Sequence, residues 1–193
     1  MGASLVMQDQ QTDTYWSLMG GAALEGPLKG ETLRELPIGE KMSWGEWRKR
    51  YPATKVLSVK GREASVNAYG DYFTNEEGFQ GLRARDARLE TKTPIFAFRL
   101  GERAFAVKQN DTVSGAVFSL PDGRSLFLYR SEQDEVLRST AAFVSTGGYT
   151  QIGEGWLEKG SGAKFGVSSR TFAFGESTRV GGFDTYWYNW SLN

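Results

Sequence analysis

The stretch that decides the fold runs from Pro94 to Tyr129 and reads PIFAFRLGERAFAVKQNDTVSGAVFSLPDGRSLFLY. Apolar side chains alternate through Ile95–Leu100, which is the period of a β-strand, and Arg103–Val107 predicts a second strand. Only Gly101 and Glu102 separate the two, and a two-residue connection is typical of an antiparallel hairpin. The first part of this stretch therefore predicts a β-hairpin.

A second hairpin is predicted where Val117–Leu120 and Ser125–Tyr129 flank Pro-Asp-Gly-Arg at 121–124. Proline sets φ at the start of such a turn and glycine accepts a positive φ near its end. Two further pairs of the same kind follow: Thr140–Ser145 with Tyr149–Ile152, and Lys164–Val167 with Arg170–Phe174. A run of hairpins predicts a mainly β, β-rich α+β fold whose antiparallel sheet curls into a barrel-like sandwich.

Two short tryptophan-bearing helices are predicted outside the hairpins. Ser43 is placed to cap the first helix, and Glu46 three residues later completes a capping box. The helix would run to about Tyr51, followed by a strand over Thr54–Lys60. The second helix is expected within Asp184–Asn193, with Asp184 as its cap.

The two helices share a spacing that suggests an internal repeat. Trp44-x-x-Trp47 and Trp187-x-x-Trp190 account for four of the six tryptophans. We interpret them as two copies of one unit in which the helix covers a sheet. The prediction is a single domain over residues 1–193, made of pseudo-repeats at about 1–92 and 93–193.

Composition excludes several classes of function. Lys plus Arg and Asp plus Glu are both 23, and this balance argues against a nucleic-acid partner held by a basic field. No apolar run reaches the about 20 residues of a membrane span. The chain contains no histidine and no cysteine, which excludes an imidazole base, a thiolate nucleophile, a disulfide and a structural zinc site. We predict a soluble protein without cofactor or metal, and its compartment stays open.

Six motifs in fixed order resemble a known family. They are Met7-x-Asp9-x-x-Thr12-x-x-x-Trp16, Gly26-Pro27-Leu28-x-Gly30, Leu36-Pro37, Trp44-x-x-Trp47-Arg48, Pro52-x-Thr54-x-Val56-Leu57 and Asp86-x-Arg88-Leu89-x-x-Lys92. The chain resembles the prokaryotic family catalogued as domain of unknown function 3179, closely over the first 110 residues and more loosely after them. The resemblance implies a duplicated protein in which each half ends in a tryptophan-bearing helix and a Pro-x-Thr.

The chain also departs from that family's pattern. Similar members carry an upstream half with a Cys-Pro-x-Cys element, and this sequence opens within a motif at Ser4–Met7 and stops at Asn193. We expect a truncated member or a portion of a longer protein, extracytoplasmic in its family context. No thiol chemistry and no catalytic residue carries over from the resemblance.

Six residues are candidates for ligand binding. Trp16 and Trp156 lie on glycine-rich segments outside the hairpin pattern and are the best candidates for an aromatic groove, whereas the paired tryptophans suit the core better. The other four are Asp71 and Tyr72 in an acidic, aromatic loop, and Arg83 and Arg85 beside Asp86. The loop suits a hard cation or acid–base chemistry, and the arginines suit an anion. Solvated loop charges and surface ion pairs explain both groups more simply.

Ser161 and Lys164 match the Ser-x-x-Lys of serine acyl-enzymes. That chemistry needs the pair at a helix start, and Gly160 and Gly162 disfavour a helix there. The match is also frequent by chance in a chain with this much serine and lysine. We therefore predict no catalytic role for the pair.

Three hypotheses on function follow. The first is a non-catalytic β-rich module of a larger bacterial or archaeal protein, which binds a small molecule or a protein partner. The alternative is a carboxylate-based, hydrolase-type enzyme with two acids facing each other in an aromatic-lined cleft. The third is a structural half-domain whose exposed apolar face drives self-association.

Overall fold

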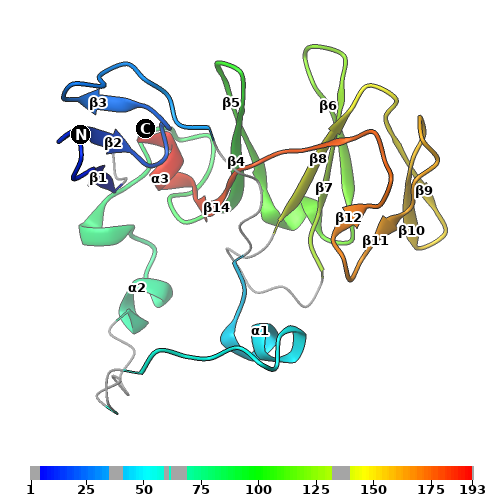
Figure 1. The fold of residues 1–193 in the computed structure, drawn as a ribbon, viewed down its shortest axis with the longest axis horizontal. Coiled ribbons are helices and arrows are strands. Elements are labelled where there is room, and N and C mark those ends of the chain that lie inside the picture. Colours follow the sequence, from blue (N-terminus) through cyan, green and yellow to red (C-terminus); the bar gives the residue numbers. More distant parts are fainter. Residues whose placement is uncertain (1–4, 35–40, 59–60, 62–68, 132–139, 193) are drawn as a thin grey trace.

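The computed structural model of the protein describes residues 5–34, 41–58, 61, 69–131 and 140–192. The described strands are divided among five antiparallel sheets, accompanied by three short α-helices and two 3₁₀ turns (Figure 1). In chain order the elements are β1 (Val6–Gln8), β2 (Tyr15–Ser17), β3 (Ala23–Glu25), α1 (Trp44–Arg50), α2 (Gly70–Thr74), η1 (Phe79–Gly81), β4 (Pro94–Leu100), β5 (Arg103–Lys108), η2 (Gln109–Thr112), β6 (Ala116–Ser119), β7 (Ser125–Tyr129), β8 (Ala141–Ser145), β9 (Tyr149–Ile152), β10 (Gly155–Glu158), β11 (Phe165–Gly166), β12 (Thr171–Phe172), β13 (Thr178–Arg179), β14 (Phe183–Tyr186) and α3 (Trp187–Ser191).

The first predicted hairpin is confirmed. Strands β4 and β5 pair in antiparallel register, with Phe98 opposite Phe105 and their rings stacked at 5.2 Å. On its other edge β4 pairs with β14, so that Thr185 lies opposite Ile95. The result is a three-stranded sheet in the order β14-β4-β5.

The second predicted hairpin and its turn mechanism are also confirmed. Strand β6 pairs with β7, and the connection closes through a hydrogen bond from the Leu120 N–H to the Arg124 carbonyl, 2.8 Å. Gly123 has φ +86°, which only glycine adopts without strain, and Asp122 accepts a hydrogen bond from the Arg124 N–H. Strands β8 and β13 extend this sheet to the order β13-β8-β7-β6.

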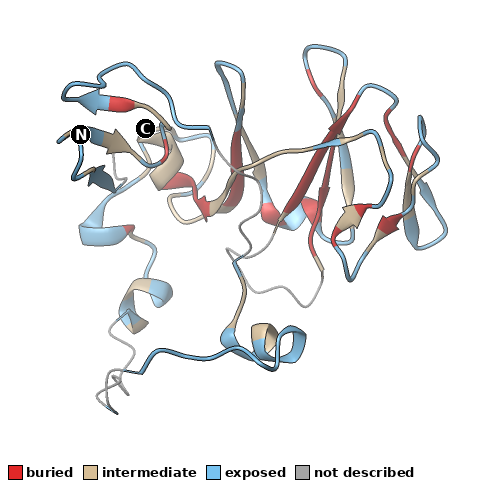
Figure 2. Cartoon of the chain, in the orientation of Figure 1, coloured by how far each residue is buried: buried red, intermediate tan, exposed pale blue. Residues whose placement is uncertain are grey.

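These two sheets pack face to face. Phe96 and Phe98 of β4 contact Leu126 and Leu128 of β7 and Val144 of β8, all nearly inaccessible to solvent. The opposite faces of the same strands are also buried, as the red segments of β4, β7 and β8 in Figure 2 show. Burial on both faces explains why these strands are apolar almost throughout.

The outer faces of the two sheets carry one further cluster each. On the β7–β8 side the cluster is aromatic and comprises Phe127, Tyr129, Phe143, Tyr149, Phe165 and Phe172, with Ala141. On the β4 side Ile95 and Ala97 pack against Trp187 of α3. The described chain is thus layered, with α3, the β4 sheet, the β7 sheet and the small C-terminal hairpins in succession.

The third predicted hairpin is wrong in its pairing. Strands β8 and β9 exist where expected, but β8 pairs with β7 and β13, whereas β9 pairs with β10. The reason is that residues 146–148 lead the chain out of the large sheet. The backbone N–H and C=O groups of β9 then pair with those of β10, the next strand in sequence. The fourth pair is confirmed as β11 with β12. The structure shows no closed or curled sheet among the described residues.

The helix predictions are confirmed in part. The hydroxyl of Ser43 accepts a hydrogen bond from the Glu46 N–H, 3.2 Å, and α1 follows as expected. The strand over Thr54–Lys60 is wrong for 54–58, which is exposed and without regular structure, and 59–60 lies outside the described residues. Asp184 does not cap α3, because it lies inside β14 and its carboxylate is engaged by Gln109 and Thr140.

The two tryptophan-bearing helices differ in their packing. Trp187 of α3 is 5% exposed against the β4 sheet, whereas Trp44 of α1 is 47% exposed and α1 buries none of its residues. Helix α1 borders a depression that it shares with Tyr129 at the end of β7 and with Val167 and Arg170, but it is not packed onto a sheet. Only α3 therefore covers a sheet in the way that the sequence suggested for both.

Candidate functional site

The two tryptophans proposed for an aromatic groove lie at opposite ends of the molecule. Trp16 is on β2 and Trp156 is on β10, at the two ends of the long axis in Figure 1. Trp156 donates its indole N–H to the Ser114 carbonyl, 2.8 Å, and packs on the Phe127 ring at 5.2 Å. They do not share a pocket, and Trp156 closes the edge of the aromatic cluster.

Trp16 instead supports a turn in the N-terminal sheet. Its indole N–H donates to the carboxylate of Asp9, 2.9 Å, which also accepts hydrogen bonds from the hydroxyl and backbone N–H of Thr12. These donors, with Trp16 the strongest, lower the pKa of Asp9 to about 2. The motif Asp9-x-x-Thr12-x-x-x-Trp16 is thus a structural unit.

Asp71 and Tyr72 lie in α2 and have different surroundings. Asp71 is exposed in the first turn. The Tyr72 hydroxyl is 3.0 Å from that of Tyr188 in α3, and the Lys92 ammonium lies over the Tyr72 ring, 4.3 Å from its centre. Burial and the Tyr188 hydroxyl raise the pKa of Tyr72. Tyr72 therefore attaches α2 to the rest of the chain.

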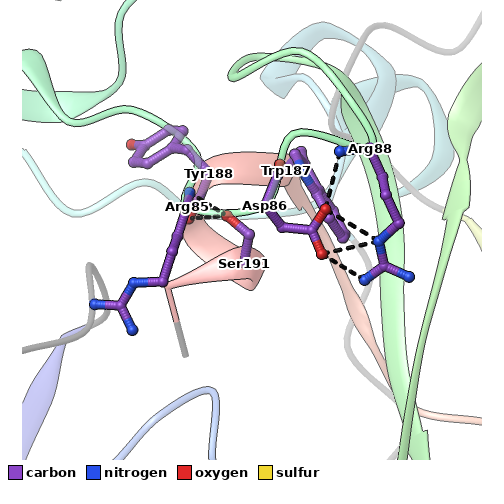
Figure 3. Close-up of polar contacts among 6 residues, drawn as sticks. All are labelled: Arg85, Asp86, Arg88, Trp187, Tyr188 and Ser191. Atoms are coloured by element: carbon purple, nitrogen blue, oxygen red, sulfur yellow. Dashed lines mark hydrogen bonds and ion pairs between the residues drawn. The ribbon is translucent and has the colours of Figure 1, made fainter.

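Arg83 and Arg85 do not converge on a common anion site. Arg83 forms an exposed ion pair with Glu77, 2.7 Å. Arg85 donates its backbone N–H to the Ser191 hydroxyl, 3.2 Å, while its guanidinium extends away from the Asp86–Arg88 pair (Figure 3). The Arg88 guanidinium lies 2.6 Å from the Asp86 carboxylate, as expected for a surface ion pair flanking Asp86.

An apolar cleft is found elsewhere, between the N-terminal sheet and the β4 sheet. It has a volume of about 600 Å³, within the range of small-molecule sites. Its aromatic lining comes from Phe183 and Trp190, and Met19 and Leu33 line the opposite wall. Phe98 of β4 borders the cleft, but its ring is buried in the core on the other face of the strand. A larger share of aromatic and aliphatic side chains distinguishes it from a polar depression of about 460 Å³ beside α1.

Backbone hydrogen bonds hold the opposite wall of this cleft in place. The turn from Ser17 to Ala22 joins β2 to β3 and is closed by the bond from the Ser17 N–H to the Ala22 carbonyl, 2.9 Å. The Leu33 N–H donates to the Gly21 carbonyl, 2.7 Å, which ties the following segment to the turn. Backbone pairing therefore fixes this wall, which also contains the buried Met19 side chain.

Two arginines stand at the cleft. Arg99 of β4 is exposed on the face opposite to its buried neighbour Phe98, and its guanidinium lies over the Trp190 ring, 5.4 Å from the centre. Arg34 approaches from the N-terminal side. In the described part of the chain neither arginine forms an ion pair, and no Asp or Glu lines this cleft. The cleft is apolar and positively charged.

Helix α3 fixes the position of Trp190. The Trp187 and Tyr188 backbone N–H groups donate to the Thr93 and Thr91 carbonyls, both at 2.9 Å, and the Trp187 indole donates to the Asp86 carbonyl, 2.7 Å. One turn later Trp190 is half-buried and extends to the cleft. The first tryptophan of the pair anchors the helix, and the second lines the cleft.

Sequence reasoning missed most of this lining. The sequence leaves Phe183 unassigned and favours the core for Trp190, and Arg34 and Arg99 belong to no motif. Their proximity depends on how the N-terminal sheet meets β4, and no local pattern encodes that contact. The one available signal was Trp190, as a member of a repeated pair.

Two other chemical possibilities concern the described residues. Ser161 lies in a turn rather than a helix and donates its hydroxyl to Glu158, so the arrangement of a serine acyl-enzyme is not formed. No group of three or more acidic side chains that would suit a metal ion occurs in the described ranges.

A comparison with protein-family models matches residues 1–192 to the family described as "Protein of unknown function (DUF3179)". The chain belongs to this family. The match extends the resemblance of the first 110 residues over the second half as well. No curated protein and no solved structure matches this DUF3179 protein. Among the helices of its described segments, none has the length and apolar character to cross a membrane.

Proposed function

We propose that this protein is a binding module and that the cleft between β4, α3 and the N-terminal sheet binds a small apolar molecule with a carboxylate group. One observation carries the proposal: Arg34 and Arg99 stand at an aromatic-lined cleft of about 600 Å³ that has no acidic lining. Apolar walls with a few charged groups are typical of small-molecule sites.

Each part of such a ligand has a counterpart in the lining. The rings of Phe183 and Trp190 offer apolar surface, and burial of apolar area stabilises a complex by about 25 cal/mol per Å² before the costs of association. A guanidinium binds a carboxylate through two parallel hydrogen bonds. Arg99 is already oriented by the Trp190 ring, so less side-chain freedom is lost on binding.

The same lining supports binding rather than hydrolysis. A carboxylate-based hydrolase needs two acidic groups on either side of the scissile bond. The lining residues of the described cleft provide two cations instead. We therefore favour the binding module over the enzyme.

We also propose that the module belongs to a larger protein and arose by duplication. Support comes from the equal spacing of Trp44-x-x-Trp47 and Trp187-x-x-Trp190 and from the position of each pair in a short helix. On this proposal only the second copy has kept its helix against a sheet, and with it the ligand cleft.

The experiment compares three probes of equal chain length: octanoate, 1-octanol and octylammonium. Titration calorimetry of the purified chain should give the tightest binding for octanoate and none for octylammonium. Arg99→Gln and Arg34→Gln should each weaken octanoate binding by about 3- to 10-fold, because each removes one charge-assisted contact. Arg103→Gln on the exposed part of β5 is the matched control and should bind normally. Equal binding of octanol, or an unchanged Kd in Arg99→Gln, would refute the proposal.

A further inference from the structure

A second hollow of the surface lies beside α1 and shares no lining residue with the octanoate cleft. Its volume is about 460 Å³, which is within the range of small-molecule sites. One side is formed by α1, and the other by Tyr129 at the end of β7 with Val167 and Arg170 of the β11–β12 turn. Segments far apart in the sequence therefore line one depression.

Arg170 brings a buried positive charge to this depression. Its backbone has φ +52°, a conformation that favours glycine, yet the chain places an arginine there and leaves it only 4% exposed. The guanidinium donates a hydrogen bond to the Tyr129 carbonyl, 3.4 Å, and lies 5.8 Å from the centre of the Tyr129 ring. Tyr129 thus holds the guanidinium in place beside the depression.

Helix α1 adds two further cations on the opposite side. Lys49 and Arg50 belong to its last turn and line the depression, whereas Arg48 of the same turn does not. Glu46 is the one acidic residue of the described lining, and its carboxylate lies 3.7 Å from the Arg50 guanidinium. Three cations and one carboxylate give the described lining a net charge of plus two.

Two serine hydroxyls extend the set of hydrogen-bond donors. Ser43 and Ser131 both line the depression. The Ser43 hydroxyl accepts a hydrogen bond from the Glu46 N–H, 3.2 Å, and can still donate its own hydrogen. Guanidinium, ammonium and hydroxyl groups together suit an oxyanion with several acceptor oxygens.

We propose that this depression binds a small phosphate monoester whose organic part is polar. Such a ligand carries almost two negative charges at neutral pH and three strong acceptor oxygens, which match the net charge and the donors of the lining. Its organic part would meet the serine hydroxyls rather than an apolar wall. A single carboxylate would balance only half of this charge, so the depression and the octanoate cleft should select different ligands.

The first test titrates the purified chain with glucose 6-phosphate by calorimetry at about pH 7.5, where the phosphate is almost fully ionised. We expect saturable binding of glucose 6-phosphate, weaker binding of inorganic phosphate and no binding of glucose. Saturating octanoate should leave the Kd of glucose 6-phosphate unchanged, since the two sites are separate. Absence of glucose 6-phosphate binding, or equal binding of glucose, would overturn the proposal.

Neighbouring residues of α1 separate a defined site from general attraction to a basic helix. Lys49→Gln should weaken glucose 6-phosphate binding by about 3- to 10-fold, because it removes a cation that lines the depression. Arg48→Gln removes a charge from the same exposed turn outside the depression and should change the Kd by less than about 2-fold in about 0.15 M salt. Equal weakening by the two substitutions would overturn the site.

A substitution on the other side tests whether α1 and the β11–β12 turn form one site. Val167 is 55% exposed, so Val167→Glu should fold normally, and its carboxylate should weaken binding by at least about 10-fold. Ile152→Glu makes the same change at a residue of equal exposure, 57%, that does not line the depression, and should bind normally. Normal binding by a folded Val167→Glu would overturn the proposal.

Discussion

Two aspartates hold separate segments together by accepting several hydrogen bonds each. Asp9 organises the N-terminal turn through Thr12 and Trp16. Asp184 of β14 accepts from the Gln109 side chain at 2.5 Å and from the Thr140 N–H at 2.9 Å, and so joins three parts of the chain. At Asp9 these donors favour the ionised form of the carboxylate.

The first prediction concerns the pH dependence of Asp9. Its pKa is lowered to about 2, so its contribution to stability is complete above its unfolded value of 3.8 and is lost as the pH falls through about 2. NMR titration of the Asp9 carboxyl carbon should give a midpoint near that value. Trp16→Phe removes the strongest donor and should raise the midpoint, whereas Trp156→Phe at the opposite end should not. An unchanged midpoint in Trp16→Phe would show that the indole is not the cause.

The second prediction concerns Asp184. Asp184→Asn removes the charge and replaces one acceptor oxygen by an NH₂ group. That donor would face another donor, either the Thr140 N–H or the amide of the buried Gln109. The free energy of unfolding in urea should fall by about 1–3 kcal/mol. Asp111→Asn changes an exposed residue of η2 and should cost less than about 0.5 kcal/mol. Equal effects of the two substitutions would contradict the role of Asp184.

At the scale of elements, the sequence predicts those strand pairings that are determined by residues close together along the chain. The β4–β5 and β6–β7 hairpins could be predicted because their turn chemistry lies within a few residues of the pairing strands. The pairing of β8 with β13 could not, because Val144 and Thr178 are far apart in sequence. Tyr149–Ile152 had equally suitable neighbours on both sides, and the choice between them depends on tertiary packing.

The third prediction tests an element-to-element contact at Gly115, just before β6. Gly115 has φ +100°, and a Cβ there would lie 2.3 Å from the Trp156 Nε1. Gly115→Ala should therefore strain the backbone and also displace the indole from the Ser114 carbonyl. Gly30→Ala, with φ +92° and open space around it, carries the backbone strain alone.

In urea denaturation we expect Gly115→Ala to be less stable than Gly30→Ala by at least about 1 kcal/mol. A shift of the Trp156 fluorescence emission should accompany only the first substitution. Equal stability of the two variants would mean that the contact between β6 and β10 contributes nothing.

For the whole molecule, the layered packing gives Phe127 the central position on one side of the large sheet. Its ring is fully buried and lies 5.1–5.3 Å from those of Tyr149, Trp156, Phe165 and Phe172. The fourth prediction is that Phe127→Ala lowers the unfolding free energy by about 3–5 kcal/mol. Trp44→Ala on α1, which buries no residue, should change it by less than about 0.5 kcal/mol. A large loss in Trp44→Ala would show that α1 belongs to the core.

The candidate site shows how far a single sequence leads at this scale. The composition excluded functions that need a histidine or cysteine side chain, and the spacing shared by the two tryptophan pairs pointed to Trp190. The cleft, however, is assembled from residues near 18–21, 32–34, 98–101, 183 and 190, which no motif connects. Trp16 and Trp156 were chosen for their local surroundings, and those surroundings engage both indoles in structural hydrogen bonds.

The most direct measurement records the indole N–H signals of the six tryptophans by NMR while octanoate is added to the purified chain. The proposed cleft predicts a saturable shift of the Trp190 signal whose midpoint moves to an about 3- to 10-fold higher octanoate concentration in Arg99→Gln, with the Trp156 signal unchanged at the far end. A shift confined to Trp156 or Trp44, or no saturable shift of Trp190, would contradict the account.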